Sequence, residues 1–166
     1  PLFTAFGPKA IETRVSKITG SNAKIILTDS INKSKLDELP NCPLIIEIDR
    51  SKDSEENFNK KLIKQKTDLK TVSLTRIDPF TTLFTSGTTG NPKGVVYPNE
   101  MLTAIAAYMI YGIGLHKTDS YWCMADPGWA YGLLYAVIGP LLLGATTTMY
   151  EGCLLYTSDA ADEEDS

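Results

Sequence analysis

The sequence is poor in the residues that build metal centres and disulfide frameworks. It has one histidine, His116, and three cysteines, Cys42, Cys123 and Cys153, which share no close spacing. Zinc sites and disulfide scaffolds need clusters of such side chains, so both are excluded and a reducing compartment is expected. His116 lies in GLHKTD, where a capping or exposed role is expected because no nucleophile or carboxylate is tied to it by spacing.

Large blocks of positive charge are also missing. The formal net charge is -4, and the richest basic run, NKKLIKQKTDLK, follows the acidic stretch DSEEN. Such a mixed segment is typical of a solvated helix face and loop. Proteins that bind nucleic acid through its phosphates need a basic surface. We therefore expect no nucleic-acid partner.

Two uncharged runs raise the question of a membrane. Residues 101–115 carry no formal charge but are short for a bilayer span, and residues 127–150 are interrupted by glycines and Pro140. Buried helix followed by strand is the favoured interpretation, so no stable membrane span is expected, with a membrane hairpin as the alternative. The start lacks the features of a signal peptide and has no initiator Met, which suggests a piece of a longer protein.

The last residues, CLLYTSDAADEEDS, turn from apolar to acidic without a linker. The run Cys153 to Glu163 resembles the in-frame translation of a transposase adapter used to build sequencing libraries. An acidic, disordered natural tail is the alternative. We therefore expect residues 1–152 to be native and residues 153–166 to be a disordered, adapter-derived tail that is set aside in reasoning about the fold.

Along the chain, segments with the hydrophobic periodicity of a helix alternate with short apolar segments typical of strands. Strands are predicted at AKIILTD, PLIIEID, FTTLFTS, GVVYP, SYWCMAD and ATTTMY, and helices at FGPKAIETRVSKITG, SINKSKLDEL, DSEENFNKKLIKQK, NEMLTAIAAYMIYGIGL and GWAYGLLYAVIGPLLLG. Ser30 and Asn99 are the predicted caps of two helices, and Phe58, Leu62 and Ile63 would share one helical stripe. This alternation predicts an α/β fold with layered helices around a mostly parallel sheet.

The stretch FTSGTTGNPKGVVYP packs hydroxyls, glycines and a lysine between two apolar runs. Hydroxyls can donate hydrogen bonds to anionic oxygens, glycines allow close backbone approach, and successive amides can form an anion nest. A lysine adds a mobile positive charge suited to phosphate. The stretch therefore predicts a polyphosphate cradle, with the candidate residues Thr85, Ser86, Gly87, Thr88, Thr89, Gly90 and Lys93.

Two other interpretations compete with phosphate binding for this stretch. The Walker A pattern fails, because its second glycine position counted from Gly87 holds Pro92, and Gly94 stands where Ser or Thr should bind Mg²⁺. A plain turn-prone hairpin between two strands is the simpler alternative. The density of hydroxyls together with a lysine favours phosphate binding.

The same stretch resembles the phosphate-binding signature [YF]TSG[ST]TGxPKG of the adenylate-forming (AMP-binding) superfamily, which includes acyl-CoA synthetases, peptide-synthetase adenylation domains and luciferases. A second segment, YWCMADPGWAYGLLYAVIGPLLLGATTTMYEG, is similar to the ADxGWxxG…GPLxxGAT…EG region of acetyl-CoA-synthetase-like enzymes for short- and medium-chain acids. The opening resembles the same enzymes' upstream helix and strand. The resemblance covers nearly all of residues 1–152 and implies part of the large N-terminal domain.

The resemblance implies an ATP-dependent acid–thiol ligase. A carboxylic acid would react with ATP to give an acyl-adenylate, and coenzyme A would then give a thioester, with Mg²⁺ accompanying ATP. Trp129, Ala130 and Tyr131 would line the acyl pocket; the alternative is that these aromatics are core residues at a helix start. For Asp126, a structural role as a cap of the following helix is at least as strong a hypothesis as a chemical one.

Several family features are absent. No histidine follows GV, and the adenine and Mg²⁺ motif, the ribose-binding aspartate, the hinge and the catalytic lysine would all lie downstream. No catalytic residue or metal ligand is therefore assigned, and the isolated chain is predicted to be inactive. The alternatives are another adenylate-forming enzyme, such as a peptide-synthetase domain, and a non-catalytic membrane or interaction segment. The expected location is the cytoplasm, or the mitochondrial matrix in a eukaryote.

Overall fold

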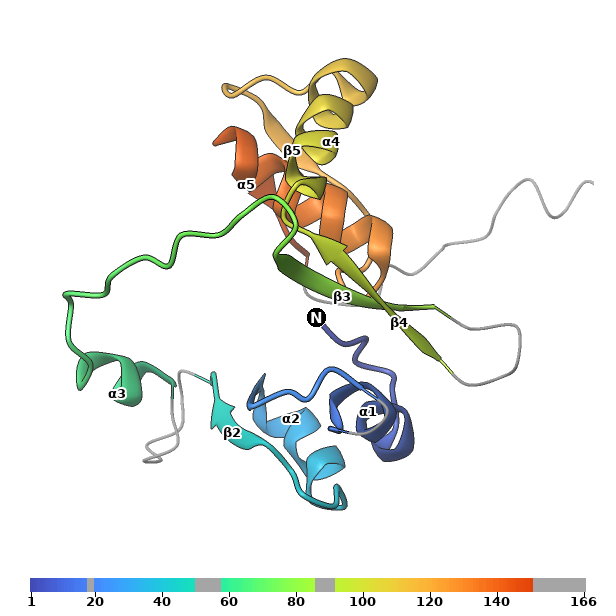
Figure 1. Cartoon of the computed structure of the whole chain (residues 1–166), viewed down its shortest axis with the longest axis vertical. Coiled ribbons are helices and arrows are strands. Elements are labelled where there is room, and N and C mark those ends of the chain that lie inside the picture. The colour runs from blue at the N-terminus through green and yellow to red at the C-terminus, as the bar shows by residue number, and fades with distance from the viewer. Residues whose placement is uncertain (18–19, 50–57, 86–91, 151–166) are drawn as a thin grey trace, which may run out of the picture.

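The chain folds as an α/β protein, as predicted. A computed structural model describes residues 1–17, 20–49, 58–85 and 92–150. These residues form three separate two-stranded sheets (Figure 1), of which two are parallel and one is an antiparallel hairpin. The α/β class and the prevalence of parallel pairing are thus confirmed, while the strands form separate pairs within the described part of the chain.

The elements follow the predicted order. The helices are α1 (Pro8–Val15), α2 (Ser30–Lys33), the 3-10 helix η1 (Ser34–Leu36), α3 (Phe58–Ile63), α4 (Met101–Ala107), the π-helical segments η2 (Tyr108–Ile113) and η3 (Gly132–Ile138), and α5 (Gly139–Leu143). The strands are β1 (Ile25–Thr28), β2 (Leu44–Glu47), β3 (Pro79–Thr85), β4 (Lys93–Pro98), β5 (Ser120–Trp122) and β6 (Thr146–Thr148). Each predicted strand and helix overlaps one of these elements.

The N-terminal part is built on the parallel pair β1–β2. Parallel strands need a crossover connection, and α2 with η1 supplies it. One face of the pair packs on α1 and η1 through a small core of Ile11, Leu36 and Leu39. On the opposite face Ile25 and Leu27 remain more than half exposed, so this sheet is covered on one side only within the described residues.

The cap of α2 lies one residue before the predicted one. Asp29 is the capping residue, and its carboxylate accepts a hydrogen bond from the Asn32 amide at 2.7 Å. Ser30 begins the helix instead, and its own amide donates to the Asp49 carboxylate at 2.7 Å. A carboxylate at the cap adds a favourable charge at the helix N-terminus, which explains why Asp29 takes this place.

The predicted cap of α4, Asn99, is also wrong. Glu100 precedes the helix and makes no side-chain capping bond. The Asn99 carbonyl accepts from the Leu102 amide at 3.1 Å, and its side-chain amide donates to the Thr75 carbonyl at 3.4 Å. Asn99 therefore ties the helix start to the preceding loop rather than satisfying a helical amide.

Helix α3 forms where predicted, but its apolar stripe is not part of a core. Leu62 and Ile63 are 55% and 83% exposed. A helix this short is marginal without tertiary packing. Figure 1 shows that α3 is followed by the long connection that leads to β3.

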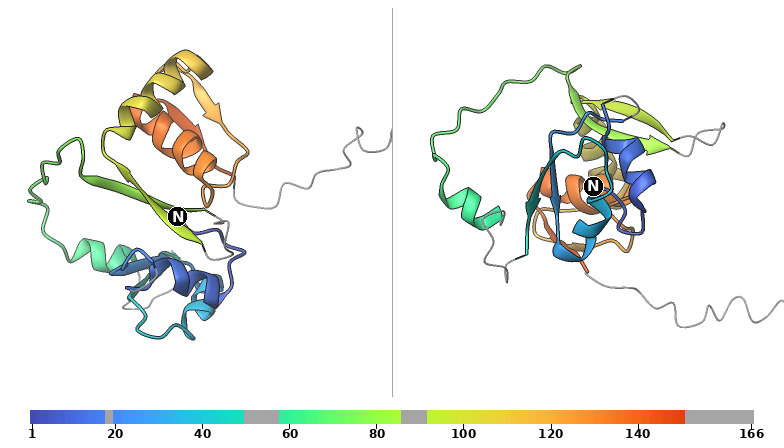
Figure 2. Two further views of the ribbon diagram at one scale, coloured as in Figure 1. Left: turned by 45° about the vertical axis from the view of Figure 1, so that its right-hand side comes forward. Right: turned by 90° about the horizontal axis from the view of Figure 1, so that it is seen from below.

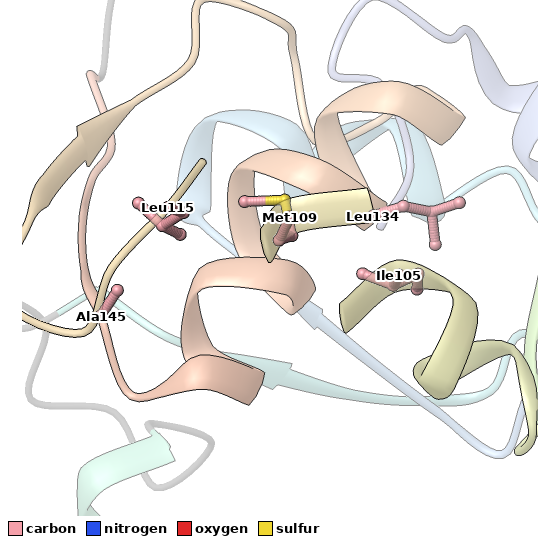
Figure 3. Packing of buried hydrophobic residues seen from close by; sticks show 5 residues of the cluster. All are labelled: Ile105, Met109, Leu115, Leu134 and Ala145. Carbon is pink, nitrogen blue, oxygen red and sulfur yellow. The ribbon is translucent and has the colours of Figure 1, made fainter. Parts of the chain in front are cut away.

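The C-terminal part has the main core. Helix α4 with η2 runs alongside η3 with α5 (Figure 2), and β5 and β6 form a short parallel pair beside them. Five buried residues fill the space between these segments (Figure 3): Ile105, Met109, Leu115, Leu134 and Ala145. The uncharged runs of the sequence thus form this packed helix pair, and in the described part of the chain no helix is both long and apolar enough to cross a bilayer.

Substitution of Met109 tests this core. Its side chain is completely buried between the two helical segments. Met109→Ala should lower the free energy of unfolding by about 2–5 kcal/mol, the usual cost of such a cavity. The control Met124→Ala removes a side chain that is 53% exposed and should change stability by about 0.5 kcal/mol or less. Equal midpoints for the two variants in urea unfolding would contradict the described core.

Candidate functional site

The β3–β4 hairpin presents the ends of the hydroxyl-rich stretch. Its antiparallel register pairs Thr85 with Lys93 and Phe84 with Gly94. The Thr85 hydroxyl donates a long hydrogen bond to the Lys93 carbonyl at 3.5 Å, and both residues are exposed. The two predicted phosphate-binding residues at the ends of the loop therefore lie directly opposite each other.

The rest of the predicted cradle falls between these two residues. Ser86, Gly87, Thr88, Thr89 and Gly90 lie outside the described residues. What the structure does describe is the pairing of Thr85 with Lys93, the residues at the two ends of the predicted cradle. The assignment of these five residues to phosphate binding stays a prediction.

A cleft of about 580 Å³ opens beside the end of β3. It is bounded by the N-terminal segment, α1, β1, the hairpin and the loop before η3. Its lining includes Phe3, Phe6, Phe84, Thr85, Trp129 and Ala130. The cleft thus unites one predicted phosphate-binding residue with two of the three predicted acyl-pocket residues. Lys93 and Tyr131 are not among the residues that line it.

Aromatic side chains from distant parts of the sequence meet at Trp129. Its ring centroid lies 5.5 Å from that of Phe3 and 6.3 Å from that of Phe6, and the two phenylalanine rings are 5.8 Å apart in an edge-to-face arrangement. Such spacings are typical of favourable aromatic pairs. The N-terminal segment therefore supplies part of the same apolar wall, which the sequence did not reveal.

Arg14 is a second lining residue that sequence reasoning missed. Its guanidinium carbon lies 4.0 Å from the centre of the Phe6 ring and 5.6 Å from that of Phe84. Arg14 therefore connects α1 to the end of β3 through these two rings. One guanidinium nitrogen donates to the Ala10 carbonyl at 2.8 Å. Partial burial lowers the pKa of Arg14, but the guanidinium remains positively charged at neutral pH. The available signal was its spacing of three from Ile11, which places both on one helix face.

Two glycines allow the turn that presents Trp129. A Cβ atom on Gly128 would lie 2.6 Å from the Phe3 Cα, and one on Gly132 would lie 2.1 Å from the Asp126 carbonyl oxygen. Both contacts are with backbone, which cannot give way as a side-chain end can. This close approach gives the glycine spacing of the GWxxG segment a physical reason.

Asp126 shapes the same turn. Its carboxylate accepts a hydrogen bond from the Gly128 amide at 2.6 Å, and its carbonyl accepts from the Trp129 amide at 3.0 Å. The residue that precedes η3 is Tyr131, without a side-chain cap. Asp126 thus has the structural role that was expected, but it forms a turn before the helix instead of capping it.

Tyr131 turns away from the cleft toward other tyrosines. Its ring centroid lies 4.8 Å from that of Tyr135, whose ring lies 4.6 Å from that of Tyr108. Interaction with the Tyr108 hydroxyl is the largest cause, ahead of burial, that raises the pKa of Tyr131 to about 12. The arrangement does not bring Tyr131 to the cleft with Trp129 and Ala130.

Among residues 1–17, 20–49, 58–85 and 92–150, no three His, Cys, Asp or Glu side chains form a group that could hold a metal ion. His116 is exposed, and its amide donates to the Asp119 carboxylate at 2.8 Å. This agrees with its expected place near a helix end, and within the described residues its imidazole makes no hydrogen bond or ion pair.

A protein-family model and several acetyl-coenzyme A synthetases match this chain. Residues 1–161 match the model of the family described as AMP-binding enzyme. An acetyl-coenzyme A synthetase of Bacillus subtilis is 31% identical over 157 residues, which cover 92% of this chain and 27% of that protein. One of Gemmatimonas aurantiaca is 52% identical over 71 residues, which cover 42% of this chain and 11% of that protein. The chain spans about a quarter of the length of the Bacillus relative.

Solved structures also superpose on this chain. An acyl-CoA synthetase of Brucella canis superposes with a TM-score of 0.79 at 44% identity, over 92% of this chain and 28% of that one. The anthranilate CoA ligase AuaEII, solved with anthranoyl-AMP, superposes with a TM-score of 0.76 at 21% identity, over 92% of this chain and 30% of that one, and so shows likeness of fold alone. The family match over residues 1–161 establishes that the chain belongs to the family of AMP-binding enzymes.

Proposed function

We propose that this chain forms part of an ATP-dependent acyl-CoA synthetase that releases AMP, acting on a short- or medium-chain carboxylic acid. The observation that carries the proposal is the cleft itself. Thr85, at the mouth of the predicted phosphate loop, lines the same cleft as Trp129 and Ala130 of the predicted acyl pocket. A reaction between a nucleotide phosphate and an apolar acid needs its two binding elements side by side.

The first step joins the acid to the nucleotide. A carboxylate oxygen attacks the α-phosphorus of ATP, the bond to the bridging oxygen breaks, and pyrophosphate leaves with the electron pair. Negative charge accumulates on the leaving group, so donors fixed beside it lower the barrier. Thr85 and the exposed ammonium of Lys93 are opposite each other at the hairpin end and are suited to this role, with Ser86, Thr88, Thr89 and the loop amides between them.

The second step uses the acyl-adenylate. The thiol of coenzyme A attacks the acyl carbon and loses its proton, and AMP departs to leave a thioester. The apolar wall of Phe3, Phe6 and Trp129 would hold the acyl chain and exclude water from the adenylate. Ala130, a small residue on the same wall, leaves room for the chain.

Mg²⁺ would accompany ATP and offset part of the negative charge of its phosphates. The described residues offer no group of three metal-binding side chains, so we propose no Mg²⁺ ligand among them and no step that depends on one. The same proposal includes a reducing location, the cytoplasm or the mitochondrial matrix, because the described Cys42 and Cys123 are free thiols.

A peptide-synthetase adenylation domain is the second candidate, because it would use the same loop for the first step. Dependence on coenzyme A separates the two. A complete protein that adenylates an acid but transfers it to a carrier-protein domain, without coenzyme A, would favour this second candidate.

The phosphate loop is tested by acid-dependent exchange of pyrophosphate into ATP in the complete protein that carries this chain. Lys93→Ala and Thr89→Val should each lower the exchange rate by about a hundredfold, the usual effect of removing one donor that stabilises developing charge. Lys70→Ala is the control, because Lys70 is exposed in the connection before β3. Exchange at the wild-type rate in both loop variants would contradict the proposed role of the loop, and no exchange with any aliphatic acid in the wild type would contradict the proposed function.

The apolar wall is tested by the two tryptophans, which are exposed to a similar extent at 53% for Trp129 and 50% for Trp122. Trp129→Leu should raise the KM for the acid about tenfold or more and shift preference toward longer acids, because it removes one side of the cleft. Trp122→Leu should leave the KM unchanged, since Trp122 does not line the cleft. Equal effects of the two substitutions on the KM would exclude Trp129 from the acid site.

A further inference from the structure

The guanidinium of Arg14 lies between the two parts of the cleft that the proposed reaction uses. Its carbon is 4.0 Å from the centre of the Phe6 ring and 5.6 Å from that of Phe84. Both distances fall within the range of about 6 Å over which a cation is attracted to an aromatic face. The Phe6 ring lies 6.3 Å from that of Trp129, and Phe84 directly precedes Thr85. Arg14 therefore connects the apolar wall to the start of the predicted phosphate-binding segment.

The ring of Phe84 contacts the second strand of the hairpin at Gly94. The two residues are partners in the rung next to the one that pairs Thr85 with Lys93. A Cβ atom on Gly94 would lie 3.2 Å from Cε1 and 3.3 Å from Cζ of Phe84, closer than ordinary van der Waals contact. The ring thus covers the backbone of Gly94, as aromatic side chains do beside a glycine on a neighbouring strand. The position of this one ring is therefore tied to both strands, beside both ends of the segment.

The charge of Arg14 has no carboxylate partner within the described residues. One guanidinium nitrogen donates to the Ala10 carbonyl at 2.8 Å, a bond within its own helix α1 that helps to fix the direction of the side chain. The planar guanidinium can stack on aromatic rings, whose faces carry partial negative charge. The two phenylalanine rings are therefore the groups with which this cation interacts outside its own helix.

We propose that Arg14 is a positioning residue that holds the ends of the segment from Thr85 to Lys93 in place against the apolar wall, through the ring of Phe84. This inference rests on the proposed function. When the acid attacks the α-phosphorus, the two reactants must be held in one geometry, and a small displacement of either slows the step. Arg14 itself takes no part in the bonds that form or break. Attack of the coenzyme A thiol on the adenylate does not use the phosphate-binding segment, so this second step should not depend on Arg14.

The test is a double-mutant cycle on pyrophosphate exchange in the complete protein, with Arg14→Met, Phe84→Leu and both together. Arg14→Met keeps a long apolar side chain but removes the charge. It should slow exchange about three- to thirtyfold, the range that one cation–π contact spans. The double variant should be no slower than Phe84→Leu alone, because Arg14 acts through that ring. Arg14→Lys, which keeps a cation, should be slowed less than Arg14→Met.

Arg76→Met is the matched control. The Arg76 side chain is 86% exposed, pairs with Glu100 at 2.8 Å and does not line the cleft. An exposed ion pair of this kind contributes little to stability. The rate of exchange in this variant should equal that of the wild type.

The second step separates positioning of the phosphate-binding segment from damage to the whole cleft. With a supplied acyl-adenylate and coenzyme A, Arg14→Met should form the thioester at the wild-type rate. If Arg14 acted mainly through Phe6, which belongs to the wall that would hold the acyl chain, both steps would be slowed. An equal loss of rate in the two steps would therefore overturn the inference.

Additive effects in the cycle, wild-type exchange in Arg14→Met, or equal rates of exchange in Arg14→Met and Arg14→Lys would also overturn it. A wild-type protein without exchange activity would overturn the proposed function instead. The contact itself is decided without activity, by the same cycle in urea unfolding. The free energies of unfolding should be non-additive for Arg14→Met and Phe84→Leu, and additive values would show that the two side chains are not coupled.

Discussion

The register of the β3–β4 hairpin is the constraint on which the site depends. Because Thr85 pairs with Lys93, the hydroxyl-rich segment between them begins and ends at one point in space. The same rung places Thr85 at the cleft, beside Phe84 and the stacked guanidinium of Arg14. A slip of one residue in this register would break the pairing of Thr85 with Lys93, and the two ends of the segment would no longer lie directly opposite each other.

The second constraint is the aromatic contact that brings the N-terminal segment to the loop before η3. Phe3 and Phe6 precede α1, whereas Trp129 lies more than a hundred residues later. Their rings meet because Gly128 lets the Phe3 backbone come close. This contact links the small N-terminal core to the helical C-terminal core, so the cleft forms between two parts that each have their own buried residues.

Much of the local structure was predictable from sequence, and most of the long-range structure was not. The order of helices and strands follows from hydrophobic period, and the two ends of the loop follow from the apolar runs beside it. The direction of Tyr131 did not follow, because position in a family pattern does not say whether its ring faces the cleft or packs on Tyr135. The roles of Phe3, Phe6 and Arg14 were missed because only folding brings these residues to the cleft that Trp129 lines.

We propose that the segment from Thr85 to Lys93 holds the outer phosphates of a nucleotide beside an apolar cleft. The most direct measurement is a crystal structure of the complete protein with a non-hydrolysable ATP analogue. The account predicts that the β- and γ-phosphate oxygens lie within hydrogen-bonding distance of this segment, with the α-phosphate directed toward Trp129. A triphosphate bound elsewhere, with this segment free of contacts to it, would contradict the account.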